Sequence, residues 1–361
     1  MRTPGWPVVL AGIHVVSGES RRVVVMWQAI FDAVTALGLG HLALRLFRRR
    51  EAAAVAFLWV ALWPPFMISS RHIFTEPLFM MLVTLMWIAA ERALGDRAGN
   101  AFPVGLWCGA AAMVRATAPV MIVGVLIGWW WLARPNWSRV WRFALWVALG
   151  FTLIVGPWAA RNALVFGRFI PLSLQSGELF YQGVMLETDG RWDHDAFERA
   201  RRGVLEREAA RLGHPPDAME SDRAMRREGL EILRSHPAES ALIALKRLWR
   251  IVFTPVVSSD RAPARLGFFV AILLLYALAL PVALRSARAG DATGRFPAIL
   301  AVTWAVTLLV SAAFYSTSRY AEPFRTIPML LASGTVGAFL ARGSTPRSAT
   351  ERDARHGIQG T

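Results

Sequence analysis

The chain consists mainly of long apolar runs separated by short polar stretches. The runs lie at residues 23–44, 53–70, 74–90, 101–114, 118–133, 143–160, 266–285, 297–314 and 324–341. Most approach the length of about 20 apolar residues that crosses a bilayer as an α-helix. The pattern therefore predicts an all-α, polytopic helical membrane protein with about nine spans.

Residues 101–133 are expected to form two short segments and not one long span. One helix of that length would measure about 50 Å, whereas a hydrocarbon core is about 30 Å thick. The stretch Arg115-Ala-Thr-Ala-Pro119 supplies a break in the middle. The split also places all the arginine clusters between runs on one face, which the positive-inside rule assigns to the cytoplasm. The clusters contain Arg45, Arg48, Arg49, Arg50, Arg92, Arg97, Arg134, Arg139, Arg142, Arg285, Arg288, Arg295 and Arg342.

The runs divide the chain into five parts. Residues 1–22 have too few apolar positions to span and are expected to lie at the extracytoplasmic interface. Residues 23–160 and 266–341 form the two sets of membrane helices, and residues 161–265 form an extracytoplasmic insert between them. The tail at 342–361 is polar and is expected to be disordered in the cytoplasm.

The insert is predicted to be mostly helical. Asp195 and Glu198 have the spacing of a capping box, and the helix they open ends at Gly213. A second helix begins near Asp217 and stops at His236-Pro237. A third, from 238 to 253, places apolar residues on one face and is expected to lie along the membrane surface.

Composition supports the membrane reading and argues against nucleic acid as a partner. The chain is 55% hydrophobic and only 18% charged, which leaves too little charge to cover a soluble domain of this size. Its net charge of +15 resides in short clusters between apolar runs and not along one polar face. The single cysteine, Cys108, permits no intrachain disulfide and is expected to be a small buried side chain.

Four loops on the arginine-poor face carry isolated charges next to apolar runs. They contain the candidate site residues Arg71, His72, Glu76, Arg115, Arg161, Asn162, Arg319, Tyr320 and Glu322. Arginines that converge at a membrane surface suit an anionic headgroup, since guanidinium matches the oxygens of a phosphate. A carboxylate among them is a candidate base toward a hydroxyl.

Simpler explanations exist for these residues. An arginine at the end of a span can extend to the lipid phosphates, and Glu76-Pro77 suits the first turn of a helix. Asp193, His194 and Asp195 carry metal-binding atoms, but adjacent residues rarely converge on one ion. No metal site is predicted, and no cofactor is expected to be required, although the sequence leaves a divalent ion open.

The order of several motifs resembles the membrane-embedded GT-C glycosyltransferases, which include protein O-mannosyltransferases and bacterial lipid A aminoarabinose transferases. The matching stretches are "RTPGWPVVLAG" (2–12), "ALRLFRRREAAAVAFLWVALWPPFMISSRHIFTEPLF" (43–79), "GLWCGAAAMVRATAP" (105–119), "GPWAARNALVFGRFIPLS" (156–173), "LEILRSHPAESALIALKRLWR" (230–250) and "SRYAEPFRTIPML" (318–330). Each motif is weak alone, and the signal lies in their order and spacing.

The resemblance implies inverting transfer of a sugar from a polyprenyl-phosphate carrier to a lipid, glycan or protein acceptor. The candidate phosphate ligands are then Arg71, Arg115, Arg161 and Arg319. His72, Asn162 and Tyr320 are candidates for the sugar or acceptor, and Glu76 for the base. The expected location is the bacterial inner membrane, with the site on the extracytoplasmic face and membrane lipids around the spans.

The chain departs from the GT-C pattern at its start. The family carries a first transmembrane helix and an acidic first-loop residue ahead of the "PGWP" motif, whereas this sequence begins at that motif. Glu19 lies later in the same loop and not at the matching position. A second reading is therefore a non-catalytic or decayed membrane protein that binds or moves polyprenyl-linked sugars. Asp32, inside the first run, is the clearest ionisable residue for such a carrier.

Overall fold

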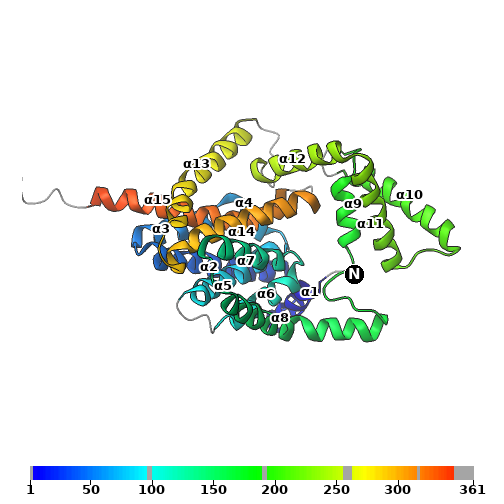
Figure 1. Ribbon diagram of the computed structural model, residues 1–361, viewed down its shortest axis with the longest axis horizontal. Helices are drawn as coiled ribbons and strands as arrows, with labels where there is room; N and C mark the ends of the chain where they lie inside the picture. Colours follow the sequence, from blue (N-terminus) through cyan, green and yellow to red (C-terminus); the bar gives the residue numbers. More distant parts are fainter. Residues whose placement is uncertain (1–2, 96–99, 189–192, 255–261, 315–317, 345–361) are drawn as a thin grey trace, which may run out of the picture.

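The protein is built from helices, as a computed structural model shows for residues 3–95, 100–188, 193–254, 262–314 and 318–344 (Figure 1). These ranges contain no strand, which confirms the predicted all-α class. The membrane-type helices are α2 (Arg21–Phe47), α3 (Arg50–Leu62), α4 (Pro64–Arg71), α5 (Glu76–Leu94), α6 (Phe102–Val114), α7 (Ala118–Ala133), α8 (Trp137–Phe166), α13 (Ala262–Ala287), α14 (Ala292–Phe314) and α15 (Thr326–Ser344).

Each of the nine predicted runs corresponds to a helix or to a pair of helices. Among the described residues, six helical segments are long and apolar enough to span a membrane, and the pair α3–α4, bent by 45°, makes up to seven, fewer than the predicted number of about nine. Pro64 and Pro65 follow Trp63 at the bend, where proline cannot continue the hydrogen-bond pattern of α3. The split of 101–133 is confirmed, because α6 ends at Val114 and α7 begins at Ala118.

The short helix α6 lies unusually close to α8. A methyl group added to Gly105 would overlap the carbonyl of Val147, and one added to Gly150 would overlap the carbonyl of Phe102. Small residues at such crossings let two backbones approach, which is a common way to pack helices in a membrane. The N-terminal helix α1 (Gly5–Ser17) packs on the end of α6, where Thr3 donates to the Val114 carbonyl at 3.0 Å.

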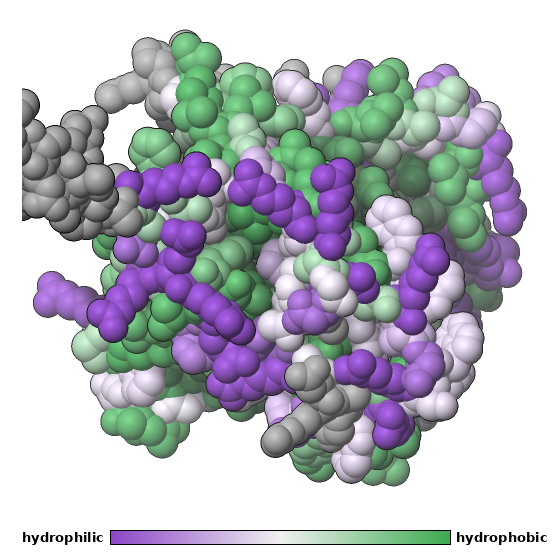
Figure 2. Space-filling model, turned by 60° about the vertical axis from the view of Figure 1, so that its left-hand side comes forward, coloured by the Kyte–Doolittle hydropathy of each residue, from purple (hydrophilic) through white to green (hydrophobic). Residues whose placement is uncertain are grey.

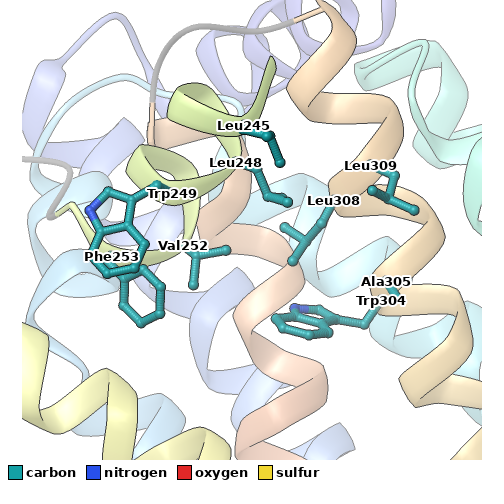
Figure 3. A pocket seen from close by; sticks show the side chains of 9 residues that line it. All are labelled: Leu245, Leu248, Trp249, Val252, Phe253, Trp304, Ala305, Leu308 and Leu309. Atoms are coloured by element: carbon teal, nitrogen blue, oxygen red, sulfur yellow. The ribbon is translucent and has the colours of Figure 1, made fainter. Parts of the chain in front are cut away.

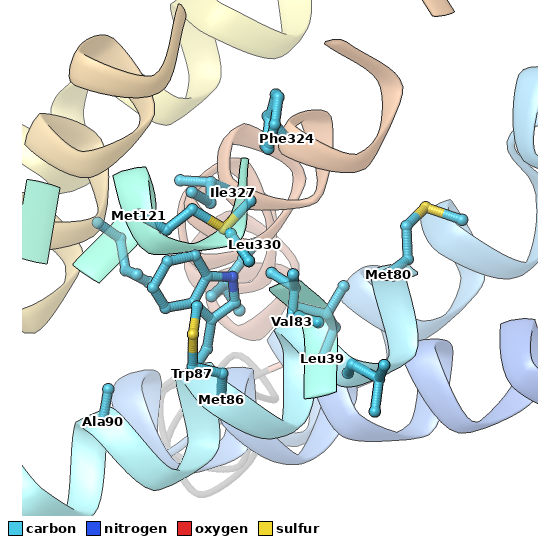
Figure 4. Close-up of a cluster of buried hydrophobic side chains, with 14 of the residues drawn as sticks. Leu39, Met80, Val83, Met86, Trp87, Ala90, Met121, Phe324, Ile327 and Leu330 are labelled. Carbon is cyan, nitrogen blue, oxygen red and sulfur yellow. The ribbon is translucent and has the colours of Figure 1, made fainter. Parts of the chain in front are cut away.

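The core of the bundle lies between α2, α5, α7 and α15. Figure 4 shows Leu39, Met86, Trp87, Met121 and Leu330 pointing toward one another from these four helices. All five are at most 1% exposed. Apolar side chains from distant parts of the sequence therefore hold the first and last membrane helices together.

A second group of helices lies at one end of the bundle, to the right in Figure 1. It consists of α9 (Ser176–Val184), α10 (His194–Leu212), α11 (Ala218–Ser235) and α12 (Pro237–Phe253). The last three confirm the helices predicted in the insert, whereas α9 was not predicted. The capping box expected at Asp195 was wrong: Asp193 caps α10 by accepting from the Ala196 amide at 2.9 Å, and Asp195 falls inside the first turn. Asp217 and Glu220 form the capping box of α11.

The arginine clusters lie at the opposite end of the bundle. Arg45 near the end of α2 pairs with Glu91 near the end of α5 at 2.9 Å, and Arg139 of α8 donates to the Gly95 carbonyl that follows α5. These contacts place the ends of α2 and α5 beside the start of α8. Figure 2, in which the left-hand side of Figure 1 comes forward, shows hydrophilic side chains across the middle of that view with hydrophobic ones above and below.

Candidate functional site

The first part of the site is a buried ion pair at the start of α5. Glu76 and Pro77 open this helix, and the Glu76 side chain is 0% exposed. Arg115, which terminates α6, approaches the Glu76 carboxylate to 2.7 Å and is itself only 9% exposed. The Arg115 guanidinium also donates to the Thr75 hydroxyl at 2.9 Å and lies 5.6 Å from the centre of the Phe79 ring. Both charges are therefore held in fixed positions.

The second part repeats this arrangement with another Glu-Pro sequence. Glu322 and Pro323 lie in the 3-10 helix η1 (Ser318–Arg325), which leads directly into α15. Glu322 is fully buried and pairs at 2.7 Å with Arg325, which is 1% exposed. The indole N–H of Trp63, at the bend between α3 and α4, donates to the Glu322 carboxylate at 3.3 Å.

The two ion pairs lie next to each other. The rings of Phe79 and Phe324, each within three residues of its glutamate, meet edge to face with centroids 6.5 Å apart. Buried charges are costly unless they are paired and hydrogen-bonded, and each glutamate here has an arginine partner. Three segments that are distant in sequence thus form one ionic cluster, which we call the Glu-Pro cluster: Glu76, Arg115, Glu322 and Arg325.

Arg325 connects the Glu-Pro cluster to α12. Its guanidinium donates to the carbonyls of Ile251 and Val252 at 3.1 and 3.2 Å, near the end of that helix. The last carbonyls of a helix lack partners within the helix and carry partial negative charge, so a guanidinium there is favourable. Arg325 also lies 4.8 Å from the Phe268 ring centre in α13. One side chain therefore joins η1, α12 and α13.

An apolar groove of about 560 Å³ lies between α12 and α14, next to this connection (Figure 3). The side chains of Val252 and Phe253 from α12 and of Trp304 and Leu308 from α14 line it. Val252 thus faces the groove while its carbonyl accepts from Arg325. A long apolar ligand in the groove would lie close to the charges of the Glu-Pro cluster.

Arg247 fixes the other side of α12. It is fully buried and donates to the carbonyls of Gly183 and Gln182, the latter at 2.7 Å, which ties α12 to α9. Burial, with a smaller effect from the nearby charge of Arg250, lowers the pKa of Arg247 to about 10. The guanidinium therefore stays protonated at neutral pH and bonds the α9 carbonyls as a cation.

The predicted residues Arg71 and His72 lie at the end of α4, and both are exposed. The His72 ring stacks on Phe74 with centroids 5.2 Å apart, and the Arg71 carbonyl accepts from Arg21 at 3.4 Å. This segment also contacts α2, because Ser70 donates to the Asp32 carboxylate. Arg71 and His72 are therefore accessible at the surface close to the start of α5.

The predicted residues Arg161 and Asn162 lie in α8 and have local roles in the described structure. Arg161 is exposed, and its guanidinium lies 5.2 Å from the ring centre of Trp158. Asn162 is fully buried and donates to the Ile170 carbonyl at 2.9 Å. Asn162 therefore holds the turn that follows α8, and Arg161 packs its cation on an aromatic side chain of its own helix.

The side chains of Arg319 and Tyr320 lie outside the described residues, so their proposed roles stay predictions. No group of three or more His, Cys, Asp or Glu that could hold a metal ion occurs in the described parts of the chain. Asp193, considered above as a metal ligand, uses its carboxylate as the cap of α10.

Three residues of the site were not predicted. Arg325 follows Glu322 by three positions, and this spacing could have suggested an ion pair. Trp63 and Arg247 gave no such signal, since their partners are distant in sequence.

Residues 1–159 match the family described as dolichyl-phosphate-mannose-protein mannosyltransferase. The matched region includes α1 to α7 and most of α8, and so it contains Glu76 and Arg115. The match confirms, over these residues, the resemblance to GT-C membrane glycosyltransferases that the motifs predicted.

Among solved structures, the chain is similar to ArnT from Cupriavidus metallidurans, whose crystal structure has undecaprenyl phosphate bound. The two are 16% identical, with a TM-score of 0.41 over 96% of this chain and 71% of the other, and no argument below depends on this likeness. No curated protein sequence matches the chain.

Proposed function

We propose that the chain is a membrane glycosyltransferase that moves a sugar from a polyprenyl-phosphate carrier to an acceptor hydroxyl. The observation that carries this proposal is the match of residues 1–159 to a family named for mannosyl transfer from dolichyl phosphate. In the reaction, the acceptor oxygen attacks the anomeric carbon and the bond from that carbon to the carrier phosphate breaks. The hydroxyl proton passes to a base, the carrier phosphate leaves, and the anomeric centre inverts.

The carrier is proposed to bind with its apolar tail in the groove between α12 and α14. The groove is lined by aliphatic and aromatic side chains, and its wall at Val252 adjoins Arg325. The phosphate would then be near Arg71 and Arg319, where fixed cations can stabilise the charge that develops on the leaving group. Arg161 is a further candidate because its cation is exposed at the end of α8.

Glu76 is proposed to position Arg115 in this arrangement. Its carboxylate is fully buried and lies 2.7 Å from the guanidinium, which orients the cation. A general base must reach the proton it removes, and a buried, ion-paired carboxylate would first have to leave its partner. Glu76 as the base stays a prediction, as do His72, Asn162 and Tyr320 as ligands of the sugar or of a lipid, glycan or protein acceptor.

The site is proposed to face the extracytoplasmic side of a bacterial inner membrane. Exposed arginines gather at the end of the bundle opposite the Glu-Pro cluster, and positively charged loops favour the cytoplasm. The helices α9 to α12 would then stand outside the membrane beside the carrier phosphate.

The proposal is tested with the purified full chain in liposomes that contain radiolabelled polyprenyl-phosphate sugars and membrane extract as the acceptor source. Transfer by the wild type that falls at least tenfold in Arg71→Ala is the expected result. Arg142→Ala, a change of an exposed arginine at the opposite end, serves as the matched control and should keep full activity.

Two outcomes would contradict the proposed transferase. Saturable binding of the carrier with no turnover for any donor sugar tested would replace the transferase by a non-catalytic carrier-binding protein. Absence of both binding and transfer would overturn the proposal altogether.

A further inference from the structure

A second pocket lies at the arginine-rich end of the bundle, far from the Glu-Pro cluster along α5. It has a volume of about 360 Å³ and opens between α2, α5 and α6. His41, Arg92 and Asn100 supply its polar atoms, while Leu85, Ile88 and Trp107 are among its apolar lining residues. The volume is within the range of small-ligand pockets, and the mixed lining is suited to an amphiphile.

The Arg92 guanidinium and the His41 imidazole at this pocket are available for a ligand. Among the residues that the structure describes, neither Arg92 nor His41 has a hydrogen-bond or ion-pair partner for its side chain, and both are exposed. The neighbouring Arg45 differs, because Glu91 accepts two hydrogen bonds from it at 2.9 and 3.1 Å. The Glu91 carboxylate is thus occupied by Arg45, and no described carboxylate pairs with Arg92.

The surroundings of the pocket favour a lipid over a soluble anion. Further exposed arginines lie in the clusters at this end of the bundle, namely Arg48, Arg49, Arg50, Arg134, Arg142 and Arg342. Such an end attracts a leaflet that contains anionic lipids, and basic pockets between membrane helices bind their headgroups. A free phosphate would leave the apolar wall of Leu85, Ile88 and Trp107 uncovered.

We propose that this pocket binds one anionic glycerophospholipid as a specific structural ligand. The lipid phosphate accepts hydrogen bonds from the Arg92 guanidinium and from the His41 imidazole. One acyl chain packs on Leu85, Ile88 and Trp107 between α5 and α6. The site is separate from the proposed carrier groove and does not depend on transfer activity.

The test is a titration of the delipidated full chain in mild detergent, followed by native mass spectrometry. The added ligands are phosphatidylglycerol, phosphatidylcholine and inorganic phosphate. We expect phosphatidylglycerol to bind about tenfold more tightly than phosphatidylcholine, because only its headgroup carries a net negative charge. Arg92→Gln should weaken phosphatidylglycerol about tenfold, since charge-assisted hydrogen bonds are lost. Arg92→Lys should lose less, since it keeps the charge but not the fork of donors.

Arg142→Gln is the matched control, as an exposed arginine at the same end that does not line the pocket. It should leave the affinity unchanged, whereas Trp107→Ala should weaken both lipids alike. Equal losses in Arg92→Gln and Arg142→Gln would overturn the proposal in favour of general surface attraction. Equal affinity for the two lipids would overturn it as well, and so would displacement of phosphatidylglycerol by an equal concentration of inorganic phosphate.

Discussion

The two ends of the helical bundle differ in that only the end with the Glu-Pro cluster buries arginines beside its exposed ones, Arg71 and Arg161, among the described residues. At one end most arginines are exposed, and Arg45, although it is ion-paired, still has 41% of its side chain open to solvent. At the other end Arg115 and Arg325 are 9% and 1% exposed and are bound to buried glutamates. The same residue type therefore marks orientation where it is free and holds helices together where it is buried.

The difference follows from the cost of moving charge out of water. An exposed arginine keeps its hydration and contributes little to packing, so its neighbours can change freely. A buried arginine needs a partner for its charge and acceptors for its N–H groups, which fixes the position of every element that supplies them. Arg325 has its charge partner in η1 and its carbonyl acceptors in α12, whereas Arg115 has its charge partner at the start of α5.

The largest effect should come from Arg325→Leu. The change leaves the Glu322 carboxylate buried without its cation and removes the donor to the α12 carbonyls, and we expect a loss of about 3–5 kcal/mol in the free energy of unfolding. Unfolding of the purified protein in mixed detergent measures it. Arg142→Leu is the control at the other end.

The double change Glu322→Gln with Arg325→Leu sharpens this test, because it removes the unpaired charge as well. It should be less destabilising than Arg325→Leu alone. If Arg325→Leu lowered the free energy of unfolding no more than Arg142→Leu does, buried and exposed arginines would contribute equally to stability.

Glu76→Gln should have the next largest effect. The amide keeps the size of the side chain but not its charge, and Arg115 retains its bond to the Thr75 hydroxyl. A loss of about 2 kcal/mol is expected, as for hydrogen bonds to charged groups. Thr75→Val, which removes only the hydroxyl partner, should cost about 1 kcal/mol in the same unfolding assay. The reverse order would mean that the hydroxyl and not the carboxylate holds Arg115.

Arg45→Gln tests the paired arginine at the exposed end. Its partner Glu91 is only 3% exposed, but solvent reaches the guanidinium, so we expect a loss of about 1 kcal/mol. The loss should shrink at high salt, where exposed charges are screened. A loss as large as that of Arg325→Leu, unchanged by salt, would contradict the distinction drawn between the two ends.

Cysteine substitutions, which should perturb the structure least, test which side of the membrane each end of the bundle faces. Cys108 is 1% exposed, so the natural chain should not react with a thiol reagent that cannot cross the membrane. Ala116→Cys, in the turn after α6, should be labelled from outside intact cells, and Ser138→Cys, at the start of α8, only after the cells are opened. Both positions are exposed. The opposite labelling pattern would reverse the proposed topology.

Most of the fold could be predicted because hydropathy is a local property of the sequence. The apolar runs gave the membrane helices, and the break at Arg115 correctly separated α6 from α7. Local signals failed where two candidates compete: Asp193 and Asp195 can each cap a helix, and only Asp193 does so. The helix α9 was missed because its nine residues follow the polar turn after α8 and resemble a loop.

Part of the Glu-Pro cluster could be found from the sequence, but its pairings could not. Isolated charges beside apolar runs drew attention to Glu76, Arg115 and Glu322, which the structure places in the Glu-Pro cluster, whereas Arg325 was missed. Their partners depend on how α5, α6 and η1 meet, and no single segment contains that information. For the same reason the pairing of Arg115 with Glu76 was not foreseen, and Arg115 as a phosphate ligand stays a prediction.

The bonds from Arg325 to α12 have a consequence for the evolution of the groove. They are made to the carbonyls of Ile251 and Val252, which every amino acid carries in the same place. A mutation that changes the side chain at Val252 can therefore reshape the wall of the groove while α12 stays attached. Single substitutions in the groove can therefore adapt it to apolar ligands of another length or thickness, while the hydrogen bonds between Arg325 and α12 are kept.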